Sequence, residues 1–555
     1  MRERLKKMKG EKIMTDSVEN KATVEEWKPK IPKVHPKVWE PATLIAGIIV
    51  AILGVMIGCE LITRVGITPN TSVIGAIIAL LVARIPITFL SKFRDVHKQN
   101  LLQTVISAGT FIGGNCILLP IGILWLFGKI ELVPVMFLGA VIGSLISMTI
   151  IYKVFDTPAF PADGIWPPGV ATAETIIAGD VGGKRAVNLL YGGIAGGIGT
   201  YFGIPMDIFG VCWIGNIWAL TMFAVGLLIR GYSKILFSQD LMVIYLPHGL
   251  MIGAGLVALY QIIKIMTQKK NAEEKEKLTY SRNASDLKTG FGAGFTFYLL
   301  GAIIVAFLGG LYTKMSTGQL IGFLLFTGVA TIAAATIIGL AAMHAGWFPG
   351  FATALIFLVL GIVLGFPPLA LCFMVGYIAS IGGAYADMGY DLKAGWILRG
   401  KGANPAFEME GRKQQYWAEL LGLIVAAAFV LTFYKGYFTN DLFPPVSRVF
   451  VTTINAGTTA GIAKWLLIWA IPGAIIQFIG GPKRQLGILL ATGLLIFNPI
   501  AGWTAVVALI TRAILLKKYG KGIENSMYVL AGGFIAGSAI ISFGTGTIKA
   551  FVRKV

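Results

Sequence analysis

Charged residues are scarce in this chain, and their scarcity excludes a protein that folds in water. Only 13% of its 555 residues are Asp, Glu, Lys or Arg, whereas soluble domains carry about 25%. The mean hydropathy is +0.76, and the apolar residues come in long unbroken runs. A helix needs roughly 20 apolar residues to cross a bilayer, and the runs lack the two-residue alternation of a membrane β-barrel. The composition therefore predicts an all-α polytopic membrane protein.

Motifs of hydrolytic, nucleotide and metal chemistry are also missing. The chain has no GxxxxGK(S/T) phosphate loop, no HExxH and no GxSxG. Its four cysteines (Cys59, Cys116, Cys212, Cys372) stand singly in apolar segments, without the spacing of a zinc site or a disulfide framework. We therefore expect no metal, no cofactor and no ATP-driven motor on this chain, and we do not expect an enzyme.

Acidic residues are outnumbered, because 27 Asp and Glu stand against 47 Lys and Arg, for a formal net charge of +20. The basic residues gather in the N-terminal arm and between apolar runs, for instance at 92–98, 269–270 and 517–521. This placement is typical of the positive-inside bias and suits contact with anionic lipids of the bilayer. We expect a multi-pass protein of the cell inner membrane with a cytoplasmic N-terminus. Nucleic acid is not an expected partner, since no motif for binding it is present.

The apolar runs divide the chain into four parts. Residues 1–40 lack the apolar core of a cleaved signal peptide and are predicted to be a basic, mostly disordered cytoplasmic arm. Residues 41–265 form a first membrane half, 266–290 a charged connector and 291–555 a second membrane half. Spanning helices are expected at 42–63, 71–91, 101–127, 131–152, 186–204, 207–229, 241–263, 291–311, 320–343, 348–366, 367–384, 416–434, 464–480, 485–497, 499–516 and 526–548.

Two proline-rich segments, 156–180 and 443–461, carry charges inside moderately apolar sequence. Broken backbone at membrane depth is tolerated only where protein buries it or where it lines a cavity, and such segments indicate a transporter's binding site. We expect the two to meet around a central polar cavity, with a kinked helix or an external loop as the alternative. WPPGVATA at 166–173 recurs as WFPGFATA at 347–354 with six of eight positions identical, which suggests an internal duplication.

Four sequence blocks occur in a fixed order: NLLQTVISAGTFIGGNCILLP (100–120), FPADGIWPPGVATAETIIAGD (160–180), ADMGYDLKAGWIL (386–398) with RKQQYWAELLG (412–422), and LAGGFIAGSAI (530–540). They resemble segments of the oligopeptide transporter family, and the chain is similar to a prokaryotic member related to the yellow-stripe-like metal-chelate carriers. Two departures are a Phe-Pro element stretched around Trp166 and an insertion at 400–411. The resemblance implies about 16 helices in two related halves and proton-coupled uptake of peptides or metal chelates.

Ionisable residues inside apolar segments are expensive and are therefore candidates for function. Glu174 follows WPPGVATA and occupies the family's Glu position, where low-dielectric surroundings favour a carboxyl that takes and releases a proton. Asp163 could hydrogen-bond a substrate amine or cap a turn. His344, beside the second Trp-x-Pro-Gly copy, and His248, within YLPHG, could bind protons or substrate, or could be satisfied interior residues.

Three further candidates lie in the second half. Asp387 and Asp391 are four residues apart, on one face if the segment is helical. They could pair with Lys393 or Arg399 as a gate, or belong to a solvated loop. Asn498, followed by Pro499, divides an apolar run into two short pieces. The carbonyls freed there could face a substrate, or the Asn-Pro pair could form a tight hairpin between two short spans.

These observations predict a secondary active transporter that couples the uptake of small peptides or metal chelates to protons. A homodimer is one of the assemblies left open. The alternatives are an intramembrane enzyme acting on lipid or peptide, and a channel, which would need a repeated pore ring that the sequence lacks.

Overall fold

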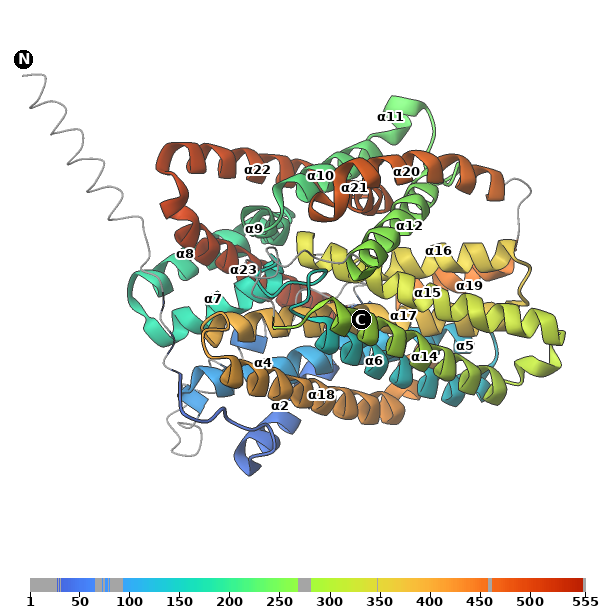
Figure 1. The fold of residues 1–555 in the computed structure, drawn as a ribbon, viewed down its shortest axis with the longest axis horizontal. Helices are drawn as coiled ribbons and strands as arrows, with labels where there is room; N and C mark the ends of the chain where they lie inside the picture. The colour runs from blue at the N-terminus through green and yellow to red at the C-terminus, as the bar shows by residue number, and fades with distance from the viewer. Residues whose placement is uncertain are drawn as a thin grey trace, which may run out of the picture.

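The computed structural model describes residues 31–64, 93–267, 281–346, 348–457 and 462–552, together with positions 27, 29, 72, 75–77 and 79. Within these residues the chain is helical and contains no strand. Eleven of the described helices are long and apolar enough to cross a membrane, and most long helices run roughly along the horizontal axis of Figure 1. The predicted all-α polytopic fold is confirmed. Most of the N-terminal arm, the expected span 71–91 and the centre of the charged connector lie outside the described residues.

The helices follow the chain in this order: α2 (Pro41–Arg64), α4 (Val96–Phe111), the π-helix η2 (Ile112–Leu118), α5 (Leu119–Leu126), η3 (Ile130–Leu132), α6 (Val133–Val154), α7 (Pro167–Val181), α8 (Gly183–Tyr201), α9 (Met206–Ile214), α10 (Ile217–Gly231), α11 (Ser233–Phe237), α12 (Leu246–Thr267), α14 (Ala284–Leu308), η4 (Leu311–Thr313), α15 (Thr317–Ala345), α16 (Gly350–Val363), α17 (Pro368–Leu398), α18 (Pro405–Thr439), α19 (Pro445–Ala456), α20 (Ile462–Arg484), α21 (Leu486–Leu495), α22 (Pro499–Tyr519), η5 (Lys521–Ile523) and α23 (Glu524–Val552).

Small residues hold the helices close together. The backbones of α8 and α23 touch at Gly192 and Gly533, where an added Cβ would collide with the facing backbone. Gly58 of α2 and Gly114 of η2 make the same kind of approach, since a Cβ at Gly114 would lie 2.9 Å from the Gly58 carbonyl oxygen. Glycine thus serves close helix packing, as expected in membranes.

Three expected spans differ markedly from the helices that form, and one of them, 416–434, is too short because α18 begins already at Pro405. The expected span 207–229 is two helices, because Asn216 accepts hydrogen bonds from the backbone N–H groups of Trp218 and Ala219 and so begins α10 afresh. The expected span 367–384 is too short, since α17 continues to Leu398. Its polar residues do not end the helix because neighbouring helices bury them.

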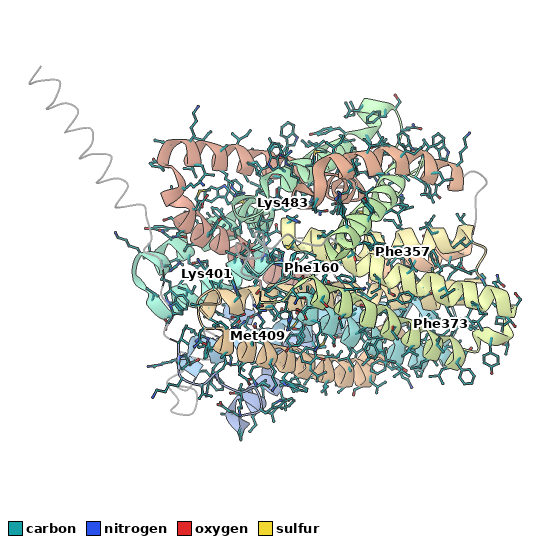
Figure 2. The ribbon with its side chains drawn as sticks, viewed as in Figure 1. Phe160, Phe357, Phe373, Lys401, Met409 and Lys483 are labelled. Carbon is teal, nitrogen blue, oxygen red and sulfur yellow. The ribbon has the colours of Figure 1, made fainter. Side chains whose placement is uncertain are left out.

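The two proline-rich segments each contain a helix, α7 and α19, and in the described part of the chain these two helices make no extensive contact. Segment 156–180 is a loop followed by α7, and its Trp166 is fully buried with a positive φ of 41°, a conformation that costs of order 1–3 kcal/mol. Phe160, near the centre of the molecule in Figure 2, packs beside this tryptophan. Helix α7 packs against α17 and α23, whereas α19 packs against α5, α16 and α17. Helix α17 contacts both α7 and α19, and residues 458–461 of the second segment lie outside the described residues, so the expected approach of the two segments stays a prediction.

Candidate functional site

A cavity of about 600 Å³ lies among the ends of the broken helices. Residues from both ends of the chain line it, from α2, α4, α8, α9 and α10 to α16, α17, α19, α22 and α23. Its walls are mostly apolar and include five phenylalanines (Phe111, Phe223, Phe348, Phe351, Phe450). Pockets that bind small molecules measure about 300–1,000 Å³, so a small organic solute fits this space.

A few polar side chains interrupt these walls: Asn115, Thr200, Asp207, Tyr390, Asn498, Ser538 and Ser542. Asp207, half-buried near the start of α9, is the only carboxylate among the described lining residues, and no Lys, Arg or His lines the cavity with it. The cavity therefore offers one negative group for a cationic centre of a ligand.

Four helix N-termini border the same space. The first turns of α9, α16, α19 and α22 contribute Asp207, Gly350, Val446 and Ala501 to the lining, and Asn498 precedes α22 there. The Asn498 side chain accepts a hydrogen bond from the Ala501 N–H at 3.0 Å, whereas α16 begins without a side-chain cap. Free N–H groups and the helix dipole make a helix N-terminus attractive to anions, so the α16 end complements Asp207.

The predicted division of the apolar run at Asn498 is confirmed. Helix α21 ends at Leu495 and α22 begins at Pro499. The short extended connection between them borders the cavity through Ile496 and Asn498.

The two Trp-x-Pro-Gly copies lie together. The backbone N–H of Trp166 donates a hydrogen bond to the Met343 carbonyl at 2.8 Å. A Cβ added at Gly346, whose φ is +68°, would lie 2.9 Å from Cδ of Pro168. Gly346 and Phe348 line the cavity, whereas segment 156–180 does not. The second copy therefore borders the cavity and the first copy supports it; Trp347 lies outside the described residues.

Asp387 and Asp391 meet a third carboxylate, Glu419 of α18, in the interior. All three side chains are fully buried, and their carboxylate oxygens lie within 4.8 Å of one another. We call Asp387, Asp391 and Glu419 the acid cluster. Gly383, one turn before Asp387 on α17, lines the cavity, as does Phe111, one turn after Ser107 on α4; Ser107 donates a hydrogen bond to Asp387. The acid cluster thus lies one helical turn, about 5 Å, from the cavity.

The depth of the acid cluster follows from the helix that carries it. Asp387 precedes the end of α17 at Leu398 by about three turns, or roughly 16 Å. The hydrocarbon core of a bilayer is about 30 Å thick, so Asp387 lies well inside a helix that is long and apolar enough to cross it. The alternative that these aspartates belong to a solvated loop is wrong, because they lie inside a helix that its neighbours cover.

The expected pairing of the aspartates with Lys393 or Arg399 is also wrong. The Lys393 ammonium donates to the Ala162 carbonyl at 2.8 Å and lies over the Trp396 ring. Arg399 binds Glu408 at 2.8 Å and Gln415 at 2.8 Å instead. Both cations therefore bind groups other than the two aspartates.

Glu408 belongs to a buried ionic network that joins α18 to the loop before α7. Arg412 binds Glu408 at 2.7 Å and Asp156 at 3.0 Å, and Asp156 also accepts hydrogen bonds from Ser281. Burial raises the pKa of Asp156, but the Ser281 hydrogen bonds and the Arg412 charge outweigh it and hold this pKa below its usual range. The network lies beside the α17–α18 connection, marked by Lys401 at one end of the bundle in Figure 2, and connects α18 to the loop after α6 there.

Glu174 stands apart from the cavity. Arg185 of α8 binds it through two hydrogen bonds, from Nε to Oε2 at 3.0 Å and from Nη2 to Oε1 at 3.2 Å. Both side chains are buried. The pair joins the two arms of the α7–α8 hairpin, and Glu174 does not line the cavity.

The remaining candidates are dispersed. His344 is buried next to the lining residue Ala345, and its Nδ1 lies 3.3 Å from the Asn216 side-chain nitrogen. His248 is buried at the start of α12 with its ring 5.5 Å from that of Tyr245. Asp163 is exposed in the loop before α7. The structure thus brings Asn498 into the cavity, places His344 beside it, and unites Asp387 with Asp391 nearby.

Three residues of this region escaped the sequence analysis: Glu419, Asp207 and Asn115. Glu419 was visible as a single acid in an apolar run, within the block RKQQYWAELLG, which is the signal of a functional intramembrane group. Asn115 gave a weaker signal, because nothing in the sequence marks the π-helix that presents it. Such π-helical turns occur frequently at functional sites.

A family model covers the part of the chain that holds this site. The model of the family described as OPT oligopeptide transporter protein matches residues 39–262 and 243–547, so the two matches between them include all the residues that line the cavity. No curated protein matches the chain.

Proposed function

The chain belongs to the OPT oligopeptide transporter family. From this premise we propose that it takes small peptides or metal chelates into the cell and that a proton gradient drives this uptake. Family membership implies a transporter of a small-molecule substrate, embedded in the membrane by many helices. The substrate, the proton and the direction are the proposed part.

The observation that carries the proposal is the cavity itself. It is lined by helix ends from both matched segments, and transporters place their substrate site where broken helices from two repeats meet near mid-membrane. A rearrangement of one half against the other would open such a site to each side in turn. The buried Asp156–Arg412 pair connects the halves on one side of it and would have to separate when that side opens.

The polar groups favour a peptide over an anionic chelate. Asp207 suits the α-ammonium group of a peptide, and the uncapped start of α16 suits its carboxylate. The phenylalanines between them suit apolar side chains. A polyanionic metal chelate would meet no lysine, arginine or histidine among the described lining residues.

We further propose that the N-terminus is cytoplasmic and that the membrane is the cell inner membrane. The start of α2 lies beside the start of α4, since Lys98 binds Glu40 at 2.7 Å. The basic residues of the arm and of positions 92–98 therefore belong to one side, which the positive-inside bias assigns to the cytoplasm.

Vesicles reconstituted with the purified chain would test this function. We expect uptake of labelled di- to tetrapeptides above that of iron or nickel chelates, and loss of uptake in Ala379→Trp, which fills the cavity. Ala428→Trp is the matched control, because Ala428 is exposed on α18 in a separate groove at the molecule's edge. Uptake that survives Ala379→Trp but fails in Ala428→Trp would show that the substrate does not use this cavity.

A further inference from the structure

The acid cluster lacks the partners that three buried carboxylates require. Ser72 and Ser107 donate to Oδ1 of Asp387, and Gln103 donates to Oδ1 of Asp391 at 2.6 Å. The other oxygens, Oδ2 of Asp387, Oδ2 of Asp391 and both oxygens of Glu419, have no hydrogen-bond donor among the described residues. Buried polar atoms are nearly always hydrogen-bonded, so donors are missing here.

A separate side chain shows the same deficit. The Gln103 amide is fully buried and reaches Asp391 through its nitrogen, yet its own carbonyl oxygen has no donor among the described residues. The hydroxyl of Tyr390, which neighbours Asp391 and is 1% exposed, can donate as well as accept, and it too has no partner in the described part of the chain. The free oxygens of the acid cluster and of Gln103 can only accept hydrogen bonds, and no described donor reaches them, which indicates a ligand that brings donors or positive charge.

No basic side chain of the described chain supplies that charge. The ionisable groups that act on the acid cluster are its own carboxylates, with the Cys116 thiol of η2 and the Tyr390 hydroxyl beside them. The uncharged polar groups that face it are Gln103, Thr104 and Ser107 from α4, Ser72, and Gln415 from α18. Lys393, Arg399 and Arg412 are engaged elsewhere, and Glu174 of α7 is neutralised by Arg185.

We propose that Asp387, Asp391 and Glu419 form the site that binds and releases the protons driving transport, with Glu419 as its least satisfied member. The inference rests on the proposed transport function and assigns it a coupling site. A proton arrives from water on the loading side and forms an O–H bond with a carboxylate oxygen. No other bond breaks, and on the opposite side the same O–H bond releases the proton to water.

Protonation supplies both the missing hydrogen-bond donors and the missing positive charge. Each bound proton removes one negative charge and converts an acceptor oxygen into a donor, which the free oxygens of Gln103 and of the neighbouring carboxylates can use. A hard metal ion fits less well, because Ca²⁺ takes six to eight oxygens and Mg²⁺ retains several waters. The acid cluster is fully buried and offers only its own few free oxygens.

The position of the acid cluster explains how protons and substrate can be coupled. Asp387 lies one turn from the lining residue Gly383 on α17, and its donor Ser107 lies one turn from the lining residue Phe111 on α4. Tyr390 both lines the cavity and neighbours Asp391. A change in the packing of α17 around a bound substrate would therefore move the carboxylates of Asp387 and Asp391, because this helix carries both. Neutral, protonated carboxyls would also cross the membrane interior at lower electrostatic cost than charged ones.

The test uses Glu419→Gln in reconstituted vesicles, with two readouts. Exchange of labelled for unlabelled peptide requires only the cavity and alternating access, whereas accumulation under an imposed pH gradient also requires proton release. One coupled proton can drive about a tenfold accumulation per pH unit. We expect Glu419→Gln to exchange substrate while its accumulation ratio falls to one, because an amide mimics the protonated acid but cannot release its proton.

Controls separate this proposal from its rivals. Glu410→Gln, on the same helix but bound to Gln414 away from the acid cluster, should accumulate substrate like the wild type. If Glu419→Gln fails to fold, Asp387→Asn takes its place with the same expectation. Wild-type accumulation by a well-folded Glu419→Gln, or accumulation that follows a Na⁺, Mg²⁺ or Ca²⁺ gradient and ignores pH, would overturn the proton site. Absence of exchange by the wild type would instead overturn the proposed function.

Discussion

Asp207 gives the sharpest prediction about substrate recognition, because it is the only carboxylate among the described residues that line the cavity. Replacing it with asparagine keeps the shape of the side chain and removes its charge. A hydrogen bond that involves a charged group contributes about 1.5–3 kcal/mol, which corresponds to about a 10- to 150-fold change in affinity. We place the loss in this range for a peptide with a free ammonium group, since the mostly apolar walls provide little competing solvation.

The assay compares a dipeptide with its N-acetylated form, which lacks the ammonium group. The half-saturation concentration of the free dipeptide should rise in Asp207→Asn, and that of the acetylated peptide should stay unchanged from an already high wild-type value. Asp441→Asn is the matched control, because Asp441 pairs with Arg448 on the surface. An equal loss for both peptides, or no loss for the free one, would refute the assignment of Asp207 to the ammonium group.

Four further predictions follow from the contacts of other residues. Arg412→Met leaves Asp156 without its cationic partner and should lower the free energy of unfolding by about 3–5 kcal/mol, measured as a lower thermal midpoint in detergent; a midpoint equal to that of wild type would contradict the role of the network. The folded-state pKa of Asp156 is depressed, so the contribution of this carboxylate to stability should be complete above about pH 4 and should be lost as the pH falls through the folded-state pKa. The difference in stability between wild type and Asp156→Asn should therefore shrink in acid. Glu174→Gln tests the sequence-based prediction that Glu174 carries the coupling proton: loss of pH-driven accumulation with exchange intact would support it, whereas the ion pair with Arg185 leads us to expect a folding defect with coupling preserved in the surviving protein. A cysteine introduced at Thr15 should resist a membrane-impermeant reagent in intact cells, and its reaction would reverse the proposed orientation.

Local chemistry made much of the fold predictable. The apolar runs predicted most helices to within a few residues, because roughly 20 apolar residues have few other options in a bilayer. The break at Asn498 was predictable for the same kind of reason, since proline kinks or breaks a helix interior. The length of α17 was not, because Asp387 and Asp391 read as the end of a span until neighbouring helices are known to bury them.

The candidate site was harder to predict, because it depends on which helices become neighbours. Asp387 and Asp391 were recognised by their four-residue spacing, but Glu419 joins them only through the packing of α17 on α18. Glu174 looked equally functional in the sequence until Arg185, eleven residues later, is seen to fold back on it. A charge inside an apolar run marks a residue that needs a partner, and tertiary structure alone decides whether that partner is an arginine or a ligand.

The central claim is proton-driven transport of a peptide by this chain alone, and one measurement tests it directly. Vesicles containing only the purified protein are loaded at neutral pH, diluted into acidic buffer with a labelled dipeptide, and followed with and without a protonophore. We predict that the dipeptide accumulates above its external concentration and that the protonophore returns it to equilibrium. Accumulation that ignores the protonophore, or entry that never exceeds equilibrium at any imposed pH gradient, would contradict the claim.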